Sequence, residues 1–347
     1  MTKNQSQFNT ATLIGVGIDV AKDSLMFCKK YDSGDKTIFE IKNKNTEIRK
    51  IANEIKAEKF LGKIIVESTG RHHLVSAPEI NKNNLDIRVI NPLLANKYIK
   101  SSIRKIKTDK RDAEVLAEIA IKEERLPNKF NSDKNALKIK KKVSLIATLD
   151  KQTQKMTAVM NEFKKTSEDI GLKLSIVEKR IFKTIKLLKE QKKELKKEVK
   201  MMAIKSEYKK EIAKRYKSIP GVSDYLASLS TIFFKEEEHS KHSKQWVAFA
   251  GLDVSVRESG NWRGKGKITK RGNGYLRKRL FQAAWGAVMN NENFKKYYEH
   301  LREKGRSYVA SLTIIARKII AIMFSLSKNK CCYDDSKKLF SLNTETK

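Results

Sequence analysis

The middle of the chain constrains the fold most strongly, because a long stretch there lacks the residues that break helices. From Asn135 to Lys217 there is no proline, and Gly171 is the sole glycine. Seven-residue spacing of apolar positions, with Lys and Glu elsewhere, predicts a coiled coil. The positions of this pattern are Ile139, Ile146, Leu149, Thr153, Met156, Met160 and Phe163, then Leu174, Ile181, Leu188, Leu195 and Met202, with Val177, Ile185 and Val199 beside them.

Gly171 is expected to mark a turn or a break between two helices. Each helix would carry one apolar stripe, and each stripe needs a partner. An antiparallel hairpin would provide that partner within one chain, and a second protomer would provide it between chains. The spacing is compatible with both arrangements.

The residues before this segment alternate between strand and helix patterns. Three strands are predicted in TLIGVGIDVA, SLMFCKKYD and KTIFEIKN, followed by a helix in TEIRKIANEIKAE with Thr46 as its N-cap. Two more strands, KIIVEST and IRVINP, follow with helices between and after them. Three early strands followed by β-α-β units predict a mixed α/β sheet with helices on its faces.

The last third is predicted to be mostly α-helical. Pro220 and Gly221 in SIPGVSDYLASLSTI indicate a tight turn between two helices. The turn is either a helix-hairpin-helix, whose backbone N–H groups could hold a phosphate, or a simple connection. The apolar stretch YVASLTIIARKIIAIMFSL carries Arg317 and Lys318 at its centre, which favours a buried helix over a membrane span. We therefore predict domains at 1–130, 131–217 and 218–330, with a tail at 331–347.

The charge balance points to a polyanionic partner. Lys and Arg number 75 against 40 Asp and Glu, a formal net charge of +35, while 39% of residues are apolar, enough for a folded core. A general bias toward lysine on solvated surfaces is the alternative explanation. The three cysteines form no C-x-x-C pair, so no zinc site or disulfide framework is indicated, which fits a reducing cytoplasm.

Four acidic residues occupy positions that suit metal binding. Asp19 and Glu67 end two predicted strands, where open α/β sheets hold catalytic groups, and Asp109 and Asp112 lie one helical turn apart. Their carboxylates could bind a pair of Mg²⁺ ions, with Mn²⁺ as a substitute, for phosphodiester cleavage. Taken singly, each acid also has an ordinary structural explanation, as a turn cap, an ion-pair partner or a helix N-terminal acid favoured by the macrodipole.

A glycine-rich basic stretch, GLDVSVRESGNWRGKGKITKRGNGYLRKRL, is the second candidate site. Its glycines allow close backbone approach, and Trp262 and Tyr275 offer planes on which bases could stack. The stretch is either a basic loop that contacts phosphates or a loop in which the Ser259 hydroxyl attacks a phosphodiester beside arginines. The basic residues expected to contact nucleic acid are Arg257, Arg263, Lys265, Lys267, Lys270, Arg271 and Arg277, with Lys107, Lys110 and Arg111 beside the acids.

Several of these motifs together resemble one family. GIDVAKDSL, VESTG, VINP and KTDKRDAEVLAEIA, in this order and spacing, resemble the DEDD transposases of the insertion-sequence 110 family, as do IPGVS, FAGLDVSVRESG and KITKRGNGYLRKRLFQAAW. The resemblance implies a RuvC-like N-terminal domain of RNase H fold and a C-terminal serine transposase domain. It implies that Asp19, Glu67, Asp109 and Asp112 are the four acids and that Ser259, rather than the nearby Ser255, is the nucleophile.

The resemblance also implies an activity and its partners. Such a protein would be a cytoplasmic, nucleoid-associated DNA recombinase that excises and inserts its own element through a covalent protein–DNA intermediate. Its partners would be the element ends and target DNA, a structured guide RNA, and further protomers in a dimer or tetramer, with no membrane. The residues alone leave two alternatives open, namely a RuvC-like metal-dependent hydrolytic nuclease and a non-catalytic nucleic-acid scaffold.

Overall fold

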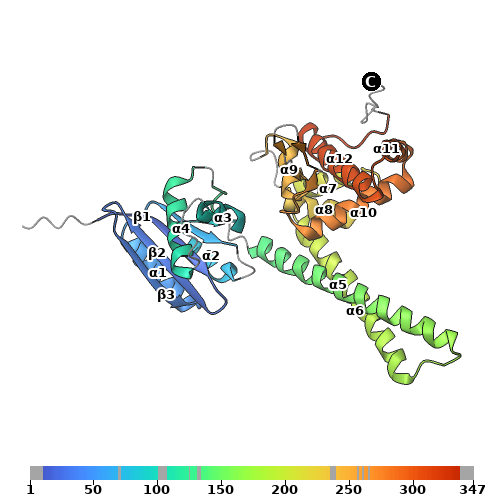
Figure 1. Cartoon of the computed structure of the whole chain (residues 1–347), viewed down its shortest axis with the longest axis horizontal. Helices are drawn as coiled ribbons and strands as arrows, with labels where there is room; N and C mark the ends of the chain where they lie inside the picture. The colour runs from blue at the N-terminus through green and yellow to red at the C-terminus, as the bar shows by residue number, and fades with distance from the viewer. Residues whose placement is uncertain are drawn as a thin grey trace, which may run out of the picture. The chain divides into compact units, whose positions relative to one another are not determined.

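The computed structural model describes residues 11–68, 72–100, 108–124, 126–130, 134–234, 240–255, 258–259, 262–264 and 266–336. The chain divides into two compact units, residues 1–134 and 135–347 (Figure 1). In this division the long helices belong to the same unit as the C-terminal region.

The first unit is built on a five-stranded sheet with the order β3-β2-β1-β4-β5. The strands are β1 (Leu13–Val20), β2 (Ser24–Tyr31), β3 (Lys36–Lys42), β4 (Lys63–Glu67) and β5 (Asp86–Ile90). The first three form an antiparallel meander, and β4 and β5 extend it in parallel beside β1. The predicted mixed sheet is therefore confirmed, strand by strand.

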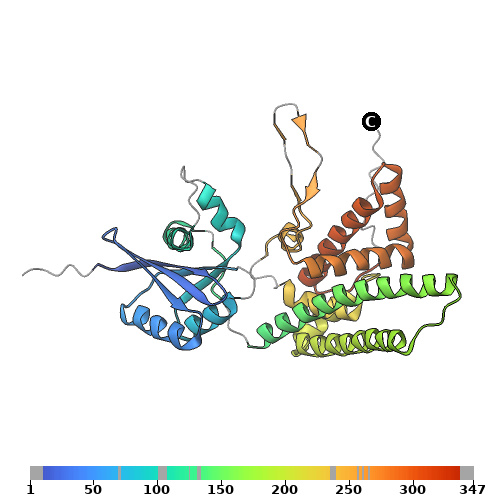
Figure 2. The same ribbon diagram turned by 60° about the horizontal axis from the view of Figure 1, so that its bottom comes forward.

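Helices cover both faces of this sheet (Figure 2). The helices α1 (Asn45–Ala57) and α2 (His73–Lys82) pack on one face, and α3 (Pro92–Lys100) and α4 (Asp109–Lys122) pack on the other. The first helix starts earlier than predicted, since its N-cap is Lys44 and not Thr46. The two layers on either side of β1 and β4 leave the carboxyl ends of these central strands at one edge of the unit.

The second unit begins with two long helices, α5 (Lys134–Asp169) and α6 (Ile176–Ala203). They form an antiparallel hairpin within the chain, because Lys142 pairs with Glu198 and Asp150 pairs with Lys192. Gly171 has a φ of +73° at the turn, which explains why the sequence interrupts its helical pattern there with glycine.

The seven-residue apolar pattern is buried unevenly along this hairpin. Near the open end Ile139, Ile146 and Val199 are fully covered and pack with Leu229 of the following helices. Toward the turn the side chains of the same pattern become exposed, among them Phe163, Ile181 and Val177. The stripe is thus covered most fully near the open end, with Met160 and Ile185 also buried closer to the turn.

The remaining helices form the second hydrophobic core. They are α7 (Glu207–Lys217), α8 (Asp224–Phe233), α9 (Ser243–Phe249), α10 (Gly274–Asn290), α11 (Glu292–Glu303) and α12 (Tyr308–Asn329). The last of these is long and apolar enough to span a membrane by length and composition, and half of its most apolar window is buried. Its packing against α7, α9, α10 and α11 accounts for its apolar character.

Candidate active site

The helix that carries two of the four acids lies directly against the central strand. A Cβ atom added to Gly17 of β1 would come within 2.1 Å of the Ala113 carbonyl oxygen and 2.3 Å of the Ala117 nitrogen. One added to Gly15 would meet Ile121 and the Ala117 carbonyl oxygen. Only glycine leaves room for a helix backbone this close, so the two glycines fix where α4 crosses the sheet.

The same contacts set the direction of α4. Moving along β1 from Gly15 to Gly17, the contacted residues on α4 step back from Ala117 and Ile121 to Ala113. Side chains alternate along a strand, so Asp19 is on the same face as the glycines. Asp19 lies two residues beyond Gly17 on the same face of β1, and it is therefore expected beside the first turn of α4.

Glu67 comes to the same place from the neighbouring strand. Gly17 pairs with Ile65 and Ile18 with Val66 in the parallel ladder between β1 and β4. Asp19 and Glu67 follow one residue later on strands about 4.8 Å apart. The structure thus gathers at one sheet edge the acids that the sequence placed at two strand ends and on one helix.

The charge state of Asp19 reflects this crowding. Burial raises the pKa of its carboxyl from 3.8 to about 6. The carboxylates of Asp112, Asp109 and Glu67 contribute to the rise in that order, while a 3.0 Å hydrogen bond from the Val20 N–H opposes it. A carboxyl held among like charges favours a proton or a cation beside it.

The first turn of α4 is itself well formed. The Thr108 hydroxyl accepts a 3.2 Å hydrogen bond from the Arg111 N–H and caps the helix. Asp109 and Asp112 lie in this turn, where the macrodipole favours negative charge. The Thr108 cap and the helix dipole therefore both stabilise the turn that carries the two carboxylates.

The donor set fits a hard divalent cation, because all four side chains supply carboxylate oxygens. Within the described residues, however, no group of three or more His, Cys, Asp and Glu side chains is arranged to hold a metal ion. Asp112 affects the pKa of Asp19 more strongly than Asp109 or Glu67 does.

The basic residues expected beside the acids differ in their surroundings. Lys110 is exposed. Arg111 lies 2.9 Å from Glu114, which also pairs with Lys36, so its guanidinium is partly neutralised within the first unit. Lys107 lies outside the described residues.

The stretch that contains the predicted nucleophile forms an arm of two short antiparallel pairs (Figure 2). The inner pair, nearer the base of the arm, joins β6 (Val254–Ser255) to β9 (Lys267–Ile268). The outer pair joins β7 (Glu258–Ser259) to β8 (Trp262–Arg263). Ser259 therefore lies in the outer pair, opposite Trp262. The side chains of this outer pair lie outside the described residues.

Ser255, the alternative nucleophile, occupies the inner pair. Its hydroxyl donates a 2.9 Å hydrogen bond to the Lys267 carbonyl oxygen across the ladder. This contact gives Ser255 a structural role in the arm.

Close backbone packing anchors the base of the arm. A Cβ added to Gly272 would lie 1.9 Å from the Phe249 carbonyl oxygen and 2.4 Å from the Gly251 nitrogen, so no other residue fits there without a shift. The Arg277 guanidinium donates a 3.1 Å hydrogen bond to the Ala250 carbonyl oxygen. Arg277 thus holds the arm to α10.

The other basic residues of the arm are distributed between exposed and undescribed positions. Lys267, Lys270 and Arg271 are exposed and free to meet a polyanion. Arg257 and Lys265 lie outside the described residues, as does the side chain of Arg263. Among the described side chains of the arm, these three are the exposed members of the predicted basic set.

The sequence analysis missed the positioning role of Gly15 and Gly17. The sequence did contain a pattern that indicates close packing. Gly15 and Gly17 lie on one face of a strand, and Ala113 and Ala117 lie on one face of a helix. Small residues in these two periods allow a helix to lie close to a sheet.

Two family models match this chain. The model of the DEDD transposase of IS110, described as "Transposase", matches residues 16–166, and the model described as "Transposase IS116/IS110/IS902 family" matches residues 213–299. The first match spans all four acids and the second spans Ser259.

Two curated proteins are similar in sequence. The transposase for insertion sequence element IS1111A of Coxiella burnetii is 25% identical over 305 residues, which cover 80% of this chain and 79% of that protein. An uncharacterized 43.6 kDa protein of insertion element IS110 from Streptomyces coelicolor is 21% identical over 117 residues, 34% of this chain and 29% of that protein. With both family models matched in order along its length, the chain belongs to the IS110 family of DEDD transposases.

Proposed function

We propose that this transposase cuts and rejoins DNA strands with a divalent-cation site at Asp19, Glu67, Asp109 and Asp112 and with Ser259 as nucleophile. The observation that carries the metal site is the half-buried Asp19 carboxyl, whose pKa of about 6 reflects burial and three neighbouring carboxylates. Mg²⁺, or Mn²⁺ in its place, would neutralise these charges and polarise a phosphodiester oxygen when bound.

The proposed cleavage step exchanges one phosphate ester for another. The Ser259 oxygen forms a bond to phosphorus, one backbone P–O bond breaks, and the leaving oxygen takes a proton. The phosphoserine linkage keeps the energy of the broken bond, so that strands rejoin without ATP. The exposed Lys267, Lys270 and Arg271 at the inner part of the arm would hold the flanking phosphates.

The decisive test is trapping of the covalent intermediate. The full chain is incubated with DNA carrying the element ends and Mg²⁺, and detergent-stable protein–DNA adducts are counted for the wild type, Asp109→Ala, Ser259→Ala and Ser255→Ala. We expect adducts with the wild type and Ser255→Ala and none with the other two. Adducts that persist in Ser259→Ala exclude this serine as nucleophile.

A hydrolytic RuvC-like nuclease is the second candidate function, because the four proposed acids all belong to the first unit. In that case strands are cut with water as nucleophile, no adduct forms, and Ser259→Ala is as active as the wild type. A non-catalytic scaffold predicts no cleavage with any metal ion and unchanged DNA binding in Asp19→Ala.

The proposal includes assembly with further protomers. Val159, Phe163, Ile176 and Val177 are exposed near the turn of the α5–α6 hairpin, and apolar side chains gathered there suit contact with a second copy. Light scattering on the wild type and on Val177→Lys tests this, with a dimer or tetramer expected for the first and a smaller species for the second.

A structured guide RNA is a further proposed partner, supported by the net charge of +35. RNA that copurifies with the protein from its own host, and that maps beside the element, would support this part of the proposal. If protein treated with ribonuclease keeps its full selectivity for the DNA target site, the guide RNA is excluded as a partner.

A further inference from the structure

A concave site in the second unit is lined by residues other than the four acids and Ser259. It has a volume of about 300 Å³ and is bounded by α6, by α10 and by the turn that leads into α8. The lining includes two basic side chains, a phenol, an amide and the backbone of the turn. These are Lys196, Arg279, Tyr225, Gln282, Gly221 and Ser223.

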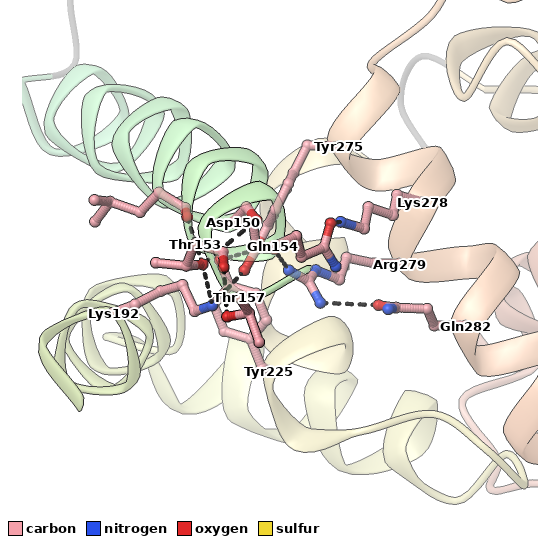
Figure 3. Close-up of polar contacts among 11 residues, drawn as sticks. Asp150, Thr153, Gln154, Thr157, Lys192, Tyr225, Tyr275, Lys278, Arg279 and Gln282 are labelled. Atoms are coloured by element: carbon pink, nitrogen blue, oxygen red, sulfur yellow. Dashed lines mark hydrogen bonds and ion pairs between the residues drawn. The ribbon is translucent and has the colours of Figure 1, made fainter. Parts of the chain in front are cut away.

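Arg279 is held firmly in the wall of this cavity. It forms an ion pair with Asp150 of α5 and donates a 2.8 Å hydrogen bond to Gln282, as Figure 3 shows. Its guanidinium also lies 4.7 Å from the centre of the Tyr275 ring. The Nε atom remains buried with no hydrogen-bond partner among the described residues, so this arginine keeps one donor unused.

Lys196 contributes a second positive charge without a nearby counterion. Its ammonium lies 5.5 Å from the centre of the Tyr225 ring, and no carboxylate among the described residues is within ion-pair distance. Burial lowers its pKa, and the charges of Lys192 and Lys278 lower it further. Asp150 is already shared by Lys192 and Arg279.

The rim of the cavity is open to solvent and formed by the tight turn. Gly221 and Ser223 are exposed, and the Ser223 hydroxyl caps α8 by accepting a hydrogen bond from Leu226 N–H at 3.3 Å. The exposed carboxylate of Asp224 lies 3.8 Å from Lys217. A helix N-terminus at the rim adds a favourable field for an anion.

We propose that this cavity binds a phosphate group of a nucleic-acid backbone, with Lys196 and Arg279 as its cationic contacts and Tyr225 and Gln282 beside them. Lys192, Lys196 and Arg279 bring three positive charges to this region, and the Asp150 carboxylate pairs with only two of them, so an excess positive charge remains that an anion would neutralise. The cavity is large enough for several water molecules, each of which needs about 30 Å³, and hence for a phosphate group with part of its solvent shell. The identity of the anion as a backbone phosphate rests on the proposed function, whereas anion binding itself does not.

The test compares Lys196→Gln with Lys197→Gln in the full chain. Lys197 is the next residue of α6, is exposed and does not line the cavity, so the control removes the same charge outside the site. Inorganic phosphate is titrated at constant ionic strength, and duplex DNA and single-stranded RNA of equal length are titrated over a range of salt. Melting temperatures in chloride are measured for all three proteins.

Lys196→Gln is expected to weaken phosphate binding at least about tenfold, because a charge-assisted contact is lost. It should also lower the slope of log K against log salt by about 0.9 for duplex DNA, or about 0.7 for RNA, as expected for one lost phosphate contact. Lys197→Gln should change phosphate affinity less than about twofold. The melting temperature of Lys196→Gln should be equal to or above that of the wild type, since a repelled cation is removed.

Three results would overturn the proposal. Equal losses in the two variants would mean that only general charge matters. A lower melting temperature with unchanged phosphate affinity would assign Lys196 to packing on Tyr225. Loss of phosphate affinity with unchanged DNA and RNA binding would mean that the cavity takes a free phosphate. A change with one polymer alone supports the proposal and identifies that polymer as the ligand.

This outcome is separable from that of the proposed function. Absence of a Ser259 adduct, together with a Lys196-dependent salt slope, would refute the serine chemistry and leave the phosphate cavity standing. An adduct that forms normally, together with equal salt slopes of nucleic-acid binding in Lys196→Gln and Lys197→Gln, would support the serine chemistry and refute the phosphate cavity.

Discussion

Each unit of this transposase contains one site at which charges of a single sign gather, and the sign differs between the two sites. In the first unit the Asp19 carboxyl is half-buried and affected by three other carboxylates. In the second unit Lys196 and Arg279 line one cavity, with Lys192 close enough to share the single carboxylate of Asp150. Like charges therefore gather in each region, negative in the first and positive in the second.

This difference in charge indicates which kind of ion would stabilise each region. A cluster of carboxylates is relieved by a cation, and a cluster of cations is relieved by an anion. A nucleic-acid backbone with divalent cations supplies both. Removing one negative charge should therefore have opposite effects on stability in the two units, which makes the comparison testable.

The largest effect is expected from Asp150→Asn in the second unit. Asp150 is buried and contacts both Lys192 and Arg279, so its loss leaves two largely buried cations without a counterion. We expect a destabilisation of about 4 kcal/mol. The three tryptophans, Trp246, Trp262 and Trp285, all lie in this unit, so urea unfolding followed by tryptophan fluorescence reports on it alone.

Asp169→Asn is the matched control for that prediction. Asp169 is exposed on the same helix, and its substitution should change the free energy of unfolding by less than about 0.5 kcal/mol. Similar losses for the two variants would contradict the central role of Asp150.

A somewhat smaller effect is expected when the contact between β1 and α4 is disturbed. Gly17→Ala places a methyl group against helix backbone and should cost about 3 kcal/mol, at the upper end for overpacking. Gly15→Ala mainly meets the flexible Ile121 side chain and should cost less. Cys28 is buried against Ala113 and Ala117, so its rate of labelling by a thiol reagent reports opening of this region.

The control for that experiment lies within the same protein. Cys331 and Cys332 are exposed and should react rapidly in every variant. Cys28 labelling should accelerate strongly in Gly17→Ala and less in Gly15→Ala. Equal rates in the two variants would show that α4 does not depend on Gly17.

The opposite sign is expected for Asp19→Asn in the metal-free protein. Because the folded pKa of about 6 is above the ordinary 3.8, the native state binds more protons than the unfolded state between these values. Wild-type stability should therefore fall as pH rises through this window. With solvent screening, Asp19→Asn should gain on the order of 1 kcal/mol at pH 7 and nothing below pH 3.8.

Cys28 labelling at pH 7 in the presence of a chelator measures this gain as a several-fold slower rate. Asp23→Asn, an exposed acid beyond the end of the same strand, is the control and should label like the wild type. Faster labelling of Asp19→Asn would mean that the carboxylate stabilises the fold, and the charge comparison would fail.

The smallest effect on stability is expected for Arg271, an exposed basic residue of the arm, with Arg277 as its comparison. Arg271→Gln removes an exposed charge, so the melting temperature should stay constant while the salt slope of DNA binding falls by about 0.9. Arg277→Gln removes the hydrogen bond to Ala250 and should lower stability by about 1.5 kcal/mol. A loss of stability in Arg271→Gln, with an unchanged melting temperature and a lower salt slope in Arg277→Gln, would mean that Arg271 is structural and Arg277 contacts DNA.

Local patterns predicted most of the first unit correctly. Alternating and apolar runs marked all five strands, and the strand order follows once the meander and the β-α-β units are joined. The four acids could be named because each follows an obvious strand or opens a helix. Their catalytic role stays a prediction, since spacing along the chain does not measure the distance between side chains.

The long helices show what a sequence pattern alone could not predict. The seven-residue spacing predicted two helices and a break at Gly171, but a stripe looks the same whichever partner it meets. The contact between Lys142 and Glu198 shows that the partner is the same chain. Exposed Phe163 and Val177 show that this partner covers only part of the stripe.

By itself, the sequence determined the elements, the excess of positive charge and the four carboxylates at element ends, because these depend on neighbours along the chain. The tertiary structure decided the approach of α4 to Gly17 and the gathering of Asp150, Lys196 and Arg279 from three helices. Contacts between residues far apart in the chain depend on how whole helices pack. A pattern read locally carries no information about that packing.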